Sequence, residues 1–322
     1  MEAIGLGVFA PSDELIPRRL SLVVENARRL EGLGFTVHLG GTIDTPAGST
    51  PAGGSRATSP KDRAKEIMSL ARRPDVHALI GAWGGKNCNE LLELLDFEEL
   101  ATTGKPLIGF SDVAVLSNAI YLMAGAKSLF GPNVLGKLHE SRFGDLAIIK
   151  SGYARGDDPF LTDRAKHSYF SGDRVVEGTL LGGNLGTFAL SIASWRKVNI
   201  SHPTLLFFET TQTDPRIVRQ YLAALKLAGV FDVATGVIIG DIPFAATFDE
   251  ACRFADHVSE SCSAPTVYVP TFGHGMFLNP PIPIGLQCRL DPIAGQISVI
   301  SSWRPLPLRE SAADRGRTTK RG

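Results

Sequence analysis

Short apolar segments alternate with helix-like segments through the first half of the chain, and this alternation is what most constrains the fold. Four apolar runs have the length of buried strands: residues 3–9, 35–39, 76–80 and 105–110. Apolar residues recur with helical spacing between them, over residues 20–30, 60–71 and 90–100. Strands that alternate with helices form a parallel sheet covered on both faces, with sites at the carboxyl ends of the strands. We therefore predict an α/β fold for this half.

The second half is richer in strand-like segments. They fall at residues 175–180, 204–209, 236–240, 266–269 and 284–290, with one clear helix over residues 215–227. Helical and strand periodicity is weak over residues 136–174, where charged and aromatic residues are mixed. We predict an α/β domain at residues 1–135 and a smaller β-rich domain at residues 175–305. Residues 136–174 between them are expected to form a linker with an active-site loop, or a plain solvated linker. Residues 306–322 are expected to be a disordered polar tail.

Composition excludes several classes of protein. The 322 residues are 43% hydrophobic and 20% charged, and Lys+Arg and Asp+Glu both total 33, so no global positive charge favours nucleic acid. No apolar run approaches the roughly 18 residues of a membrane span, and the first residues lack a basic signal-peptide region. The four cysteines lack C-x-x-C spacing, which argues against zinc. We expect a cytoplasmic protein that binds neither nucleic acid, membrane nor metal.

Ser111 occupies the most informative position in the chain. It follows the apolar run Lys105–Phe110 and opens a segment with helical periodicity. A serine at a tight strand-to-helix turn faces the helix N-terminus, where backbone N–H groups can stabilise an anion. This resembles a nucleophile elbow, although the sequence Gly-Phe-Ser-Asp-Val departs from G-x-S-x-G. The alternative is that Ser111 is only a helix N-cap.

Two further polar residues follow apolar runs in the second half. Glu209 ends Leu-Leu-Phe-Phe-Glu, and His274 lies between glycines in Phe-Gly-His-Gly. A serine nucleophile needs a base, and the base needs an orienting carboxylate, so Ser111, His274 and Glu209 could supply one of each. The alternatives are a structural pairing of Glu209 with Arg216 or Arg219 and a solvated His274.

The glycine-rich turn at residues 81–89 could approach the same strand ends. A backbone N–H of Gly84 or Gly85, together with the N–H of Asp112, would then form an oxyanion hole. An ordinary turn or a phosphate cradle are the alternatives. The spacing of a Walker A motif or of G-x-G-x-x-G is absent, which disfavours nucleotide-dependent phosphoryl or hydride transfer.

Several of these motifs, in this order, resemble the peptidase S66 family, which contains LD-carboxypeptidases of murein recycling and microcin C self-immunity hydrolases. The resemblance runs from about residue 4 to residue 303. Its motifs are Gly84-Gly85-x-Asn87-x-Asn89, Lys105-Pro-x-Ile-Gly-Phe-Ser111-Asp112, Phe130-Gly-Pro132, Leu-Phe-Phe-Glu209, Val218-Arg219-x-Tyr-Leu, Gly229-Val-Phe231, Phe272-Gly-His274 and Pro283-Ile-Gly285.

The resemblance implies a flavodoxin-like N-terminal domain joined to a smaller β-rich C-terminal domain, with the site between them. It also implies a triad without metal or other cofactor: Ser111 as nucleophile, His274 as base and Glu209 as its orienting group. Asp112 and Gly84 or Gly85 would supply the oxyanion N–H groups. Family members are usually homodimers, so the same is expected here.

The turn is closer to the Gly-Gly-x-Asn-x-Asn of the microcin-immunity branch than to the Arg-Gly-Gly-Tyr-Gly of the murein enzymes. The resemblance therefore favours cleavage of an amide in a peptidyl- or aminoacyl-nucleotide antibiotic, with Asn87 and Asn89 as substrate-binding residues. A murein tetrapeptide carboxypeptidase and a non-catalytic binding protein are the alternatives. Two departures concern nucleotide specificity: Thr210 replaces an acidic residue, and residues 136–174 contain no tryptophan.

Overall fold

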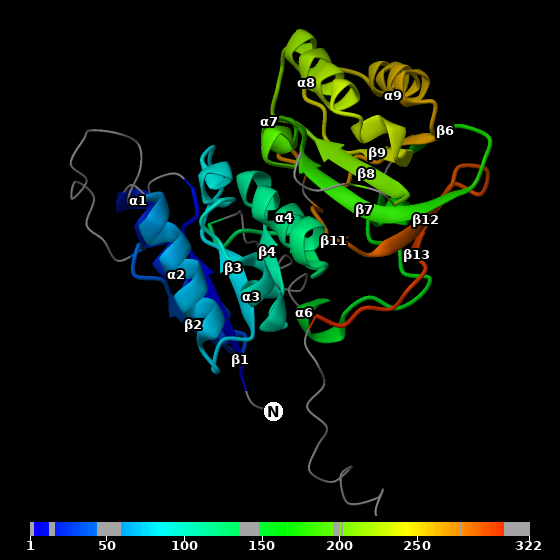
Figure 1. Ribbon diagram of the computed structural model, residues 1–322. Helices are drawn as coiled ribbons and strands as arrows, with labels where there is room; N and C mark the ends of the chain where they lie inside the picture. Colours follow the sequence, from blue (N-terminus) through cyan, green and yellow to red (C-terminus); the bar gives the residue numbers. More distant parts are fainter. Residues whose placement is uncertain are drawn as a thin grey trace, which may run out of the picture.

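The computed structural model describes residues 3–12, 17–43, 59–135, 148–165, 167–195, 200, 202–276 and 278–305. They form two sheets that lie side by side, one built mostly from the first half of the chain and the other from the second half (Figure 1). The mixed α/β class and the parallel N-terminal sheet predicted from the sequence are confirmed.

The first sheet has six strands in the order β11-β5-β4-β3-β1-β2. Five are mutually parallel, and β11 pairs antiparallel with β5 at the edge. The strand bounds are Ile4–Phe9 (β1), Phe35–Leu39 (β2), Ala78–Gly81 (β3), Leu107–Gly109 (β4), Ser128–Phe130 (β5) and Ile282–Ile284 (β11). The helices are Pro17–Gly32 (α1), Pro60–Arg72 (α2), Phe97–Thr102 (α3) and Ala114–Ala124 (α4).

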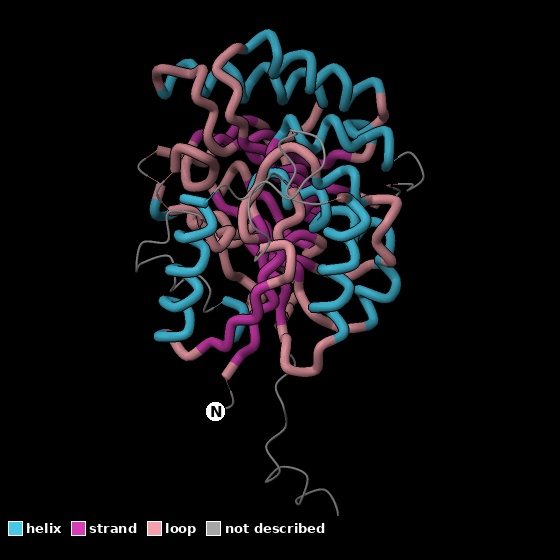
Figure 2. Tube along the Cα trace, turned by 90° about the vertical axis from the view of Figure 1, so that its left-hand side faces the viewer, coloured by secondary structure: helices cyan, strands magenta, loops and turns pink. Residues whose placement is uncertain are grey.

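Alternate residues of these strands enter two different apolar clusters, which is why helices cover both faces (Figure 2). Ile80 and Ile108 belong to the cluster that includes α1, whereas Leu79 and Leu107 pack with α2, α3 and α4. Strands that are buried on both faces give continuous apolar runs in the sequence. This explains why the strands of this sheet could be found from the sequence.

Capping residues set where the helices of this domain begin. As predicted, α2 begins after Ser59, whose side chain accepts a hydrogen bond from the N–H of Asp62. The helix predicted over residues 90–100 is wrong, because the chain forms a short 3₁₀ turn, Cys88–Leu91 (η1), and then α3. Asp96 divides the segment, since its carboxylate accepts from the N–H of Glu99 and starts α3 as an N-cap.

The second sheet has seven strands in the order β13-β12-β7-β8-β9-β10-β6. Its central strands β7 to β10 are parallel, and β6, β12 and β13 are antiparallel to their neighbours. The strand bounds are Tyr169–Ser171 (β6), Val176–Asn184 (β7), Thr204–Glu209 (β8), Ala234–Ile239 (β9), Thr266–Tyr268 (β10), Gln287–Asp291 (β12) and Gln296–Val299 (β13). The helices are Ile148–Ser151 (α6), Leu185–Trp195 (α7), Pro215–Leu227 (α8) and Phe248–Cys262 (α9).

Gly285 divides the single strand predicted over residues 284–290 into two. Its φ of 84° lies in the left-handed region, and a Cβ there would lie 2.3 Å from Cδ2 of Tyr121. The chain turns at this residue, so that β11 joins the first sheet and β12 joins the second. A segment from the C-terminal half therefore completes the N-terminal sheet.

Part of the predicted linker and loop, residues 136–147 and 166, lies outside the described residues, as does the tail at 306–322. The described part of the linker contains α6, the 3₁₀ turn Thr162–Arg164 (η4) and β6. β6 pairs with β10 at the edge of the second sheet. These residues therefore contribute to the C-terminal architecture.

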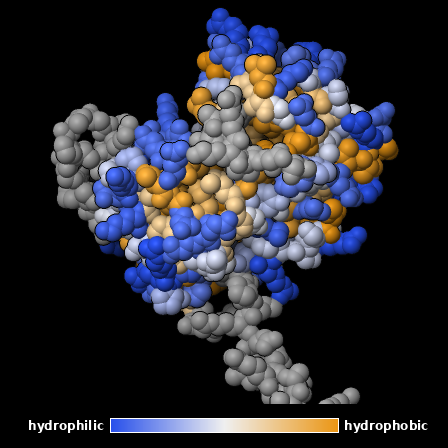
Figure 3. Space-filling model, in the orientation of Figure 1, coloured by the Kyte–Doolittle hydropathy of each residue, from blue (hydrophilic) through white to orange (hydrophobic). Residues whose placement is uncertain are grey.

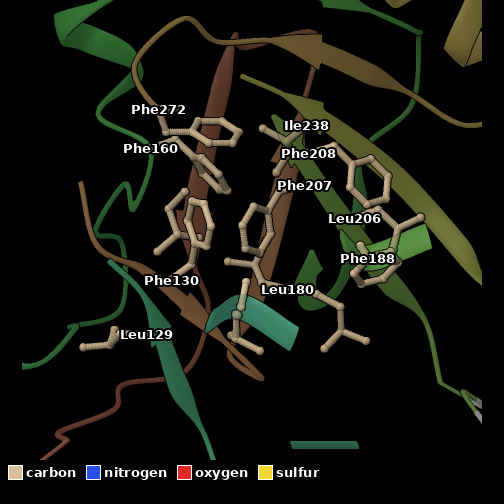
Figure 4. Close-up of a cluster of buried hydrophobic side chains, with 14 of the residues drawn as sticks. Leu129, Phe130, Phe160, Leu180, Phe188, Leu206, Phe207, Phe208, Ile238 and Phe272 are labelled. Atoms are coloured by element: carbon tan, nitrogen blue, oxygen red, sulfur yellow. The ribbon is translucent and has the colours of Figure 1, made fainter. Parts of the chain in front are cut away.

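A cluster of aromatic rings joins the two sheets (Figure 4). Phe130 at the end of β5 lies 5.5 Å from Phe207 of β8, centroid to centroid, with the rings edge to face. Phe207 also contacts Phe160 and Phe272. All four rings are buried, so hydrophobic packing holds the two sheets in one fixed relation.

The outer surface is mixed in character. On the face shown in Figure 3, hydrophilic residues dominate the outer helices, and hydrophobic residues gather over the region of α3 and α4. Leu94, between η1 and α3, and Met123 of α4 are 40% and 45% exposed. Among the described residues, no helix has the length and apolar character needed to cross a bilayer.

We predict that Phe130→Ala lowers the free energy of unfolding by about 3–5 kcal/mol, because it leaves a cavity between the two sheets. Urea unfolding followed by circular dichroism measures this loss. The matched control is Phe248→Ala, whose ring is 38% exposed and whose removal should cost about 1 kcal/mol. Equal losses in the two variants would contradict the role assigned to the aromatic cluster.

Candidate active site

Ser111 sits on a strained turn between β4 and α4. Its φ is 61°, a left-handed conformation that is uncommon for residues other than glycine. Gly109 makes the turn possible, because a Cβ at this position would lie 2.1 Å from Cγ1 of Val113. Phe110, not Ser111, is the N-cap of the 3₁₀ turn Ser111–Val113 (η2) that precedes α4, and no side chain caps it. Ser111 is therefore not the N-cap of this helical segment, and it occupies a tight turn between a strand and a helix.

The three side chains singled out in the sequence meet at one place. Oγ of Ser111 lies 3.2 Å from Nε2 of His274, and Nδ1 of His274 lies 2.6 Å from Oε2 of Glu209. Ser111 follows β4 of the first sheet and Glu209 ends β8 of the second, whereas His274 lies in the loop that leads from β10 of the second sheet to β11 of the first. A continuous hydrogen-bonded chain from hydroxyl to imidazole to carboxylate thus spans the domain boundary.

Glu209 is buried at the end of β8, with a side chain that is 0% exposed. A buried carboxylate requires hydrogen-bonding partners, and Glu209 has His274 on one oxygen and Nδ2 of Asn184, at 3.0 Å, on the other. Arg216 pairs instead with Asp214 at the start of α8. The structural pairing with Arg216 considered from the sequence is therefore wrong.

A tight loop fixes the position of His274. Gly273 has a φ of 125°, and a Cβ there would lie 2.3 Å from Cβ of Asp241. The carboxylate of Asp241 accepts a hydrogen bond from the N–H of Gly275 at 2.5 Å. The side chain of Asn279 bonds both backbone polar groups of Gly273. These contacts hold the backbone on both sides of the imidazole, which reduces the number of orientations open to the ring.

The charges around His274 favour its protonated form. Burial lowers the pKa of His274, but the hydrogen bond and charge of Glu209 and the charge of Asp241 outweigh it, so that the pKa lies above its ordinary value. Burial also raises the pKa of Asp241, with a further contribution from the charge of Glu209. Two carboxylates therefore surround one imidazole, a combination typical of functional sites.

The glycine-rich turn approaches Ser111 closely. A Cβ on Gly84 would lie 3.1 Å from Cβ of Ser111 and 3.4 Å from its Oγ, and Gly85 has a φ of 149°. The Asp112 carboxylate, 2% exposed, holds this turn by accepting from the hydroxyl of Ser12 at 2.5 Å and the N–H of Cys88 at 2.9 Å. The turn and the residue after Ser111 are thus tied together.

Buried polar residues that the sequence analysis missed complete the support of the turn. Oγ of Ser12 accepts a hydrogen bond from the N–H of Asn87 at 3.0 Å. Arg63 on α2 is 1% exposed, pairs with Glu90 at 2.5 Å and also donates to the carbonyl of Pro11. No local motif reveals these contacts, because each joins positions that are far apart in the sequence.

A cleft of about 270 Å³ opens beside Ser111. Polar residues line it, among them Lys86, Asn89, Asn184, Thr187, Gln212 and Tyr221. Of the two asparagines predicted to bind substrate, Asn89 lines the cleft and Asn87 does not. No described residue of the predicted active-site loop, 136–174, lines this cleft. A larger cavity of about 780 Å³ lies apart from the three side chains, against residues 148–164 and 296–298.

In the part of the chain that the structure describes, no three His, Cys, Asp or Glu side chains come together as metal ligands. A hydroxyl hydrogen-bonded to an imidazole, beside backbone N–H groups at a helix start, is suited to attack on a carbonyl carbon.

We predict that Asp241→Asn lowers the pKa of His274, because a negative charge that favours the imidazolium is removed while an acceptor for the N–H of Gly275 remains. NMR titration of the imidazole nitrogens would measure the change. Glu25→Gln on the outer face of α1 removes an exposed carboxylate and should leave the titration unchanged. An unchanged or higher pKa in Asp241→Asn would contradict the charge arrangement.

Comparison with known families assigns both halves of the chain. Residues 6–131 match the LD-carboxypeptidase N-terminal domain of peptidase S66, and residues 177–290 match the corresponding C-terminal domain. The N-terminal match precedes the C-terminal match along the chain, and together they cover most of it.

Individual relatives have two named activities. The chain is 28% identical over 212 residues to the microcin C7 self-immunity protein MccF of Escherichia coli, covering 58% of this chain and 62% of MccF. It is 31% identical over 173 residues to a murein tetrapeptide carboxypeptidase of Pseudomonas aeruginosa, covering 50% and 52%. Both alignments therefore span less than two thirds of the relative.

The fold is also that of a solved member. The structure of MccF in complex with aspartyl sulfamoyl adenosine superposes with a TM-score of 0.76, at 22% identity, over 94% of this chain and 98% of that one. With both domain models matched in order and the fold shared, the protein belongs to the peptidase S66 family of LD-carboxypeptidases.

Proposed function

We propose that the protein is a serine hydrolase that cleaves an amide bond with Ser111 as nucleophile, His274 as general base and Glu209 as the group that orients the imidazole. The observation that carries this proposal is the hydrogen-bonded chain from Oγ of Ser111 through both ring nitrogens of His274 to Glu209. A nucleophile, a base and an orienting carboxylate in this order are the elements of a catalytic triad.

The proposed reaction begins when Nε2 of His274 accepts the hydroxyl proton of Ser111 and Oγ bonds to the carbonyl carbon. The imidazolium that forms is stabilised by Glu209 and Asp241, whose negative charges favour it. His274 then gives the proton to the amide nitrogen, the C–N bond breaks, and the amine leaves. Water, deprotonated by the same imidazole, hydrolyses the acyl-enzyme and restores Ser111.

The oxyanion of the tetrahedral intermediate would be held by the N–H of Asp112 and an N–H of the Gly84-Gly85 turn. The close approach of Gly84 to Ser111 supports this assignment. The N–H of Asp112 lies in the first turn of helix after the nucleophile, where peptide dipoles favour negative charge. Such preorganised donors stabilise the transition state more than the ground state.

The favoured substrate is the amide of an aminoacyl- or peptidyl-nucleotide, the class to which aspartyl sulfamoyl adenosine belongs. Support comes from the similarity to MccF and from the Gly84-Gly85-x-Asn87-x-Asn89 sequence of the turn. A second candidate is a murein tetrapeptide whose terminal D-alanine is released. The 31% identity to the Pseudomonas aeruginosa carboxypeptidase favours it.

We predict that the wild-type protein hydrolyses one of these substrates and that Ser111→Ala lowers kcat by at least about 10⁴-fold, since the nucleophile is removed. Mass spectrometry of the products of aspartyl sulfamoyl adenosine and of an LD-tetrapeptide identifies the substrate. Circular dichroism checks that the variant is folded. Turnover by Ser111→Ala near the wild-type rate would rule out the mechanism, and stoichiometric binding without product would indicate a binding protein.

We also predict that Ser12→Ala lowers kcat by roughly 10²-fold, because the turn that carries Gly84 and Gly85 loses the hydroxyl that links Asn87 to Asp112. Steady-state kinetics on the substrate identified above measure the effect. Ser12→Thr keeps the hydroxyl and should retain most of the activity. If both variants behave like the wild type, the Ser12 link does not position the turn.

A further inference from the structure

The imidazole of His274 packs against an aromatic ring in addition to making its two hydrogen bonds. The ring of Phe110 lies 4.7 Å from it, centroid to centroid, with an angle of 48° between the two planes. Aromatic rings at such a separation attract each other. The side chain of His274 is 32% exposed, so part of the imidazole faces solvent while another part packs against Phe110. The base of the proposed reaction is therefore held by packing as well as by hydrogen bonds.

This packing restrains a movement that the hydrogen bonds resist only weakly. Glu209 and Ser111 bond to the two ring nitrogens of His274. Both nitrogens direct their N–H or lone pair within the plane of the imidazole. The two bonds therefore resist sliding of the ring within its plane more than tilting out of it. The ring of Phe110, which lies at an angle to the imidazole, opposes tilting toward its side.

Phe110 is itself fixed to the first sheet. The side chain of Asn133, which is 4% exposed, accepts a hydrogen bond from the N–H of Phe110 at 2.9 Å and donates one to its carbonyl at 3.1 Å. The ring of Phe110 also lies 4.9 Å from that of Phe130 at the end of β5. Phe130 in turn packs against Phe207. The contact with His274 therefore continues into the aromatic cluster that joins the two sheets.

Phe110 and Ser111 are consecutive residues of one turn, so the ring and the nucleophile are carried by the same piece of backbone. We propose that Phe110 is a positioning residue whose ring holds the imidazole of His274 within hydrogen-bonding distance of Oγ of Ser111. This inference rests on the proposed role of His274 as the base for Ser111. A movement of the His274 loop relative to the turn would have to compress or open the ring contact in order to change the distance between hydroxyl and imidazole.

The alternative is that Phe110 only fills space behind the turn, and Phe248 provides a matched comparison. The ring of Phe248, at the start of α9, lies 5.3 Å from the imidazole of His167 at an angle of 51°, and 6.1 Å from the ring of Tyr268. Phe248 thus has the same kind of histidine contact and a second aromatic neighbour. None of these three residues lines the cleft beside Ser111.

The first experiment compares the steady-state kinetics of wild type, Phe110→Leu, Phe110→Tyr and Phe248→Leu. Leucine keeps an apolar side chain without the ring, whereas tyrosine keeps the ring. We expect Phe110→Leu to lower kcat about tenfold and to leave KM within about twofold, because a displaced base affects the transition state more than substrate binding. Phe110→Tyr should stay within about threefold of the wild-type kcat, since the ring contact is retained. Phe248→Leu should resemble the wild type.

Circular dichroism at the assay temperature checks that each variant is folded. If Phe110→Leu is unfolded, Phe110→Met takes its place, because methionine is flexible enough to fill the space of the ring. Wild-type kcat without the ring, a loss confined to KM, or an equal loss in Phe110→Tyr would overturn the proposal.

The second experiment measures the hydrogen bond itself and needs no substrate. The NMR chemical shift of Nε2 of His274 is recorded with Ser111 and with Ser111→Ala, at a pH well above the pKa of His274, so that the ring is neutral in every variant. The difference reports the bond to the hydroxyl. We expect Phe110→Leu to reduce this difference by at least about half, and Phe110→Tyr and Phe248→Leu to preserve it. An unchanged difference in Phe110→Leu would show that the ring does not position the imidazole.

The two experiments separate this inference from the proposed function. If the wild type turns over neither aspartyl sulfamoyl adenosine nor the LD-tetrapeptide, the hydrolase function fails, and the Nε2 shifts still decide whether Phe110 holds the imidazole at Ser111. If the wild type is active and Ser111→Ala is not, while Phe110→Leu has wild-type kcat and Nε2 shifts, the inference fails and the hydrolase function stands.

Discussion

The hydrogen bond between His274 and Ser111 joins the loop after β10 to the turn after β4, so it exists only if the two sheets that contain these strands keep a fixed relation. The aromatic packing of Phe130 against Phe207 helps to hold the two sheets in place, because it buries rings from both sheets in one cluster. The chain itself also links the two sheets at Gly285, where it turns from β11 of the first sheet to β12 of the second. The geometry of the site is therefore a consequence of core packing some distance from it.

Burial and nearby charges shift the pKa of His274 in opposite directions. Removing His274 from water disfavours its protonated form, and the nearby carboxylates of Glu209 and Asp241 more than restore it. Glu209 can be buried because His274 and Asn184 satisfy both of its oxygens. In the proposed mechanism His274 accepts a proton from Ser111, and these carboxylates would stabilise the charged ring without reorganisation.

Strain and close packing are concentrated on the first-sheet side. The left-handed conformation of Ser111 and the near contact of Gly84 with it are unfavourable for an isolated chain. The buried links from Asp112 to Ser12 and Cys88, and from Arg63 to Glu90, offset them by holding the turn in place.

The sequence by itself determined the parallel sheet of the first domain, the serine turn and the identity of the three central side chains. Buried strands give continuous apolar runs, and the polar residues that follow them stand out locally. It did not determine the break between η1 and α3, the division of residues 284–290 at Gly285 or the buried partners Ser12, Arg63, Asn184 and Asp241. Those depend on contacts between distant segments, such as Tyr121 beside Gly285. Only the tertiary structure decided that hydroxyl, imidazole and carboxylate meet, because local pattern carries no information on how two sheets pack.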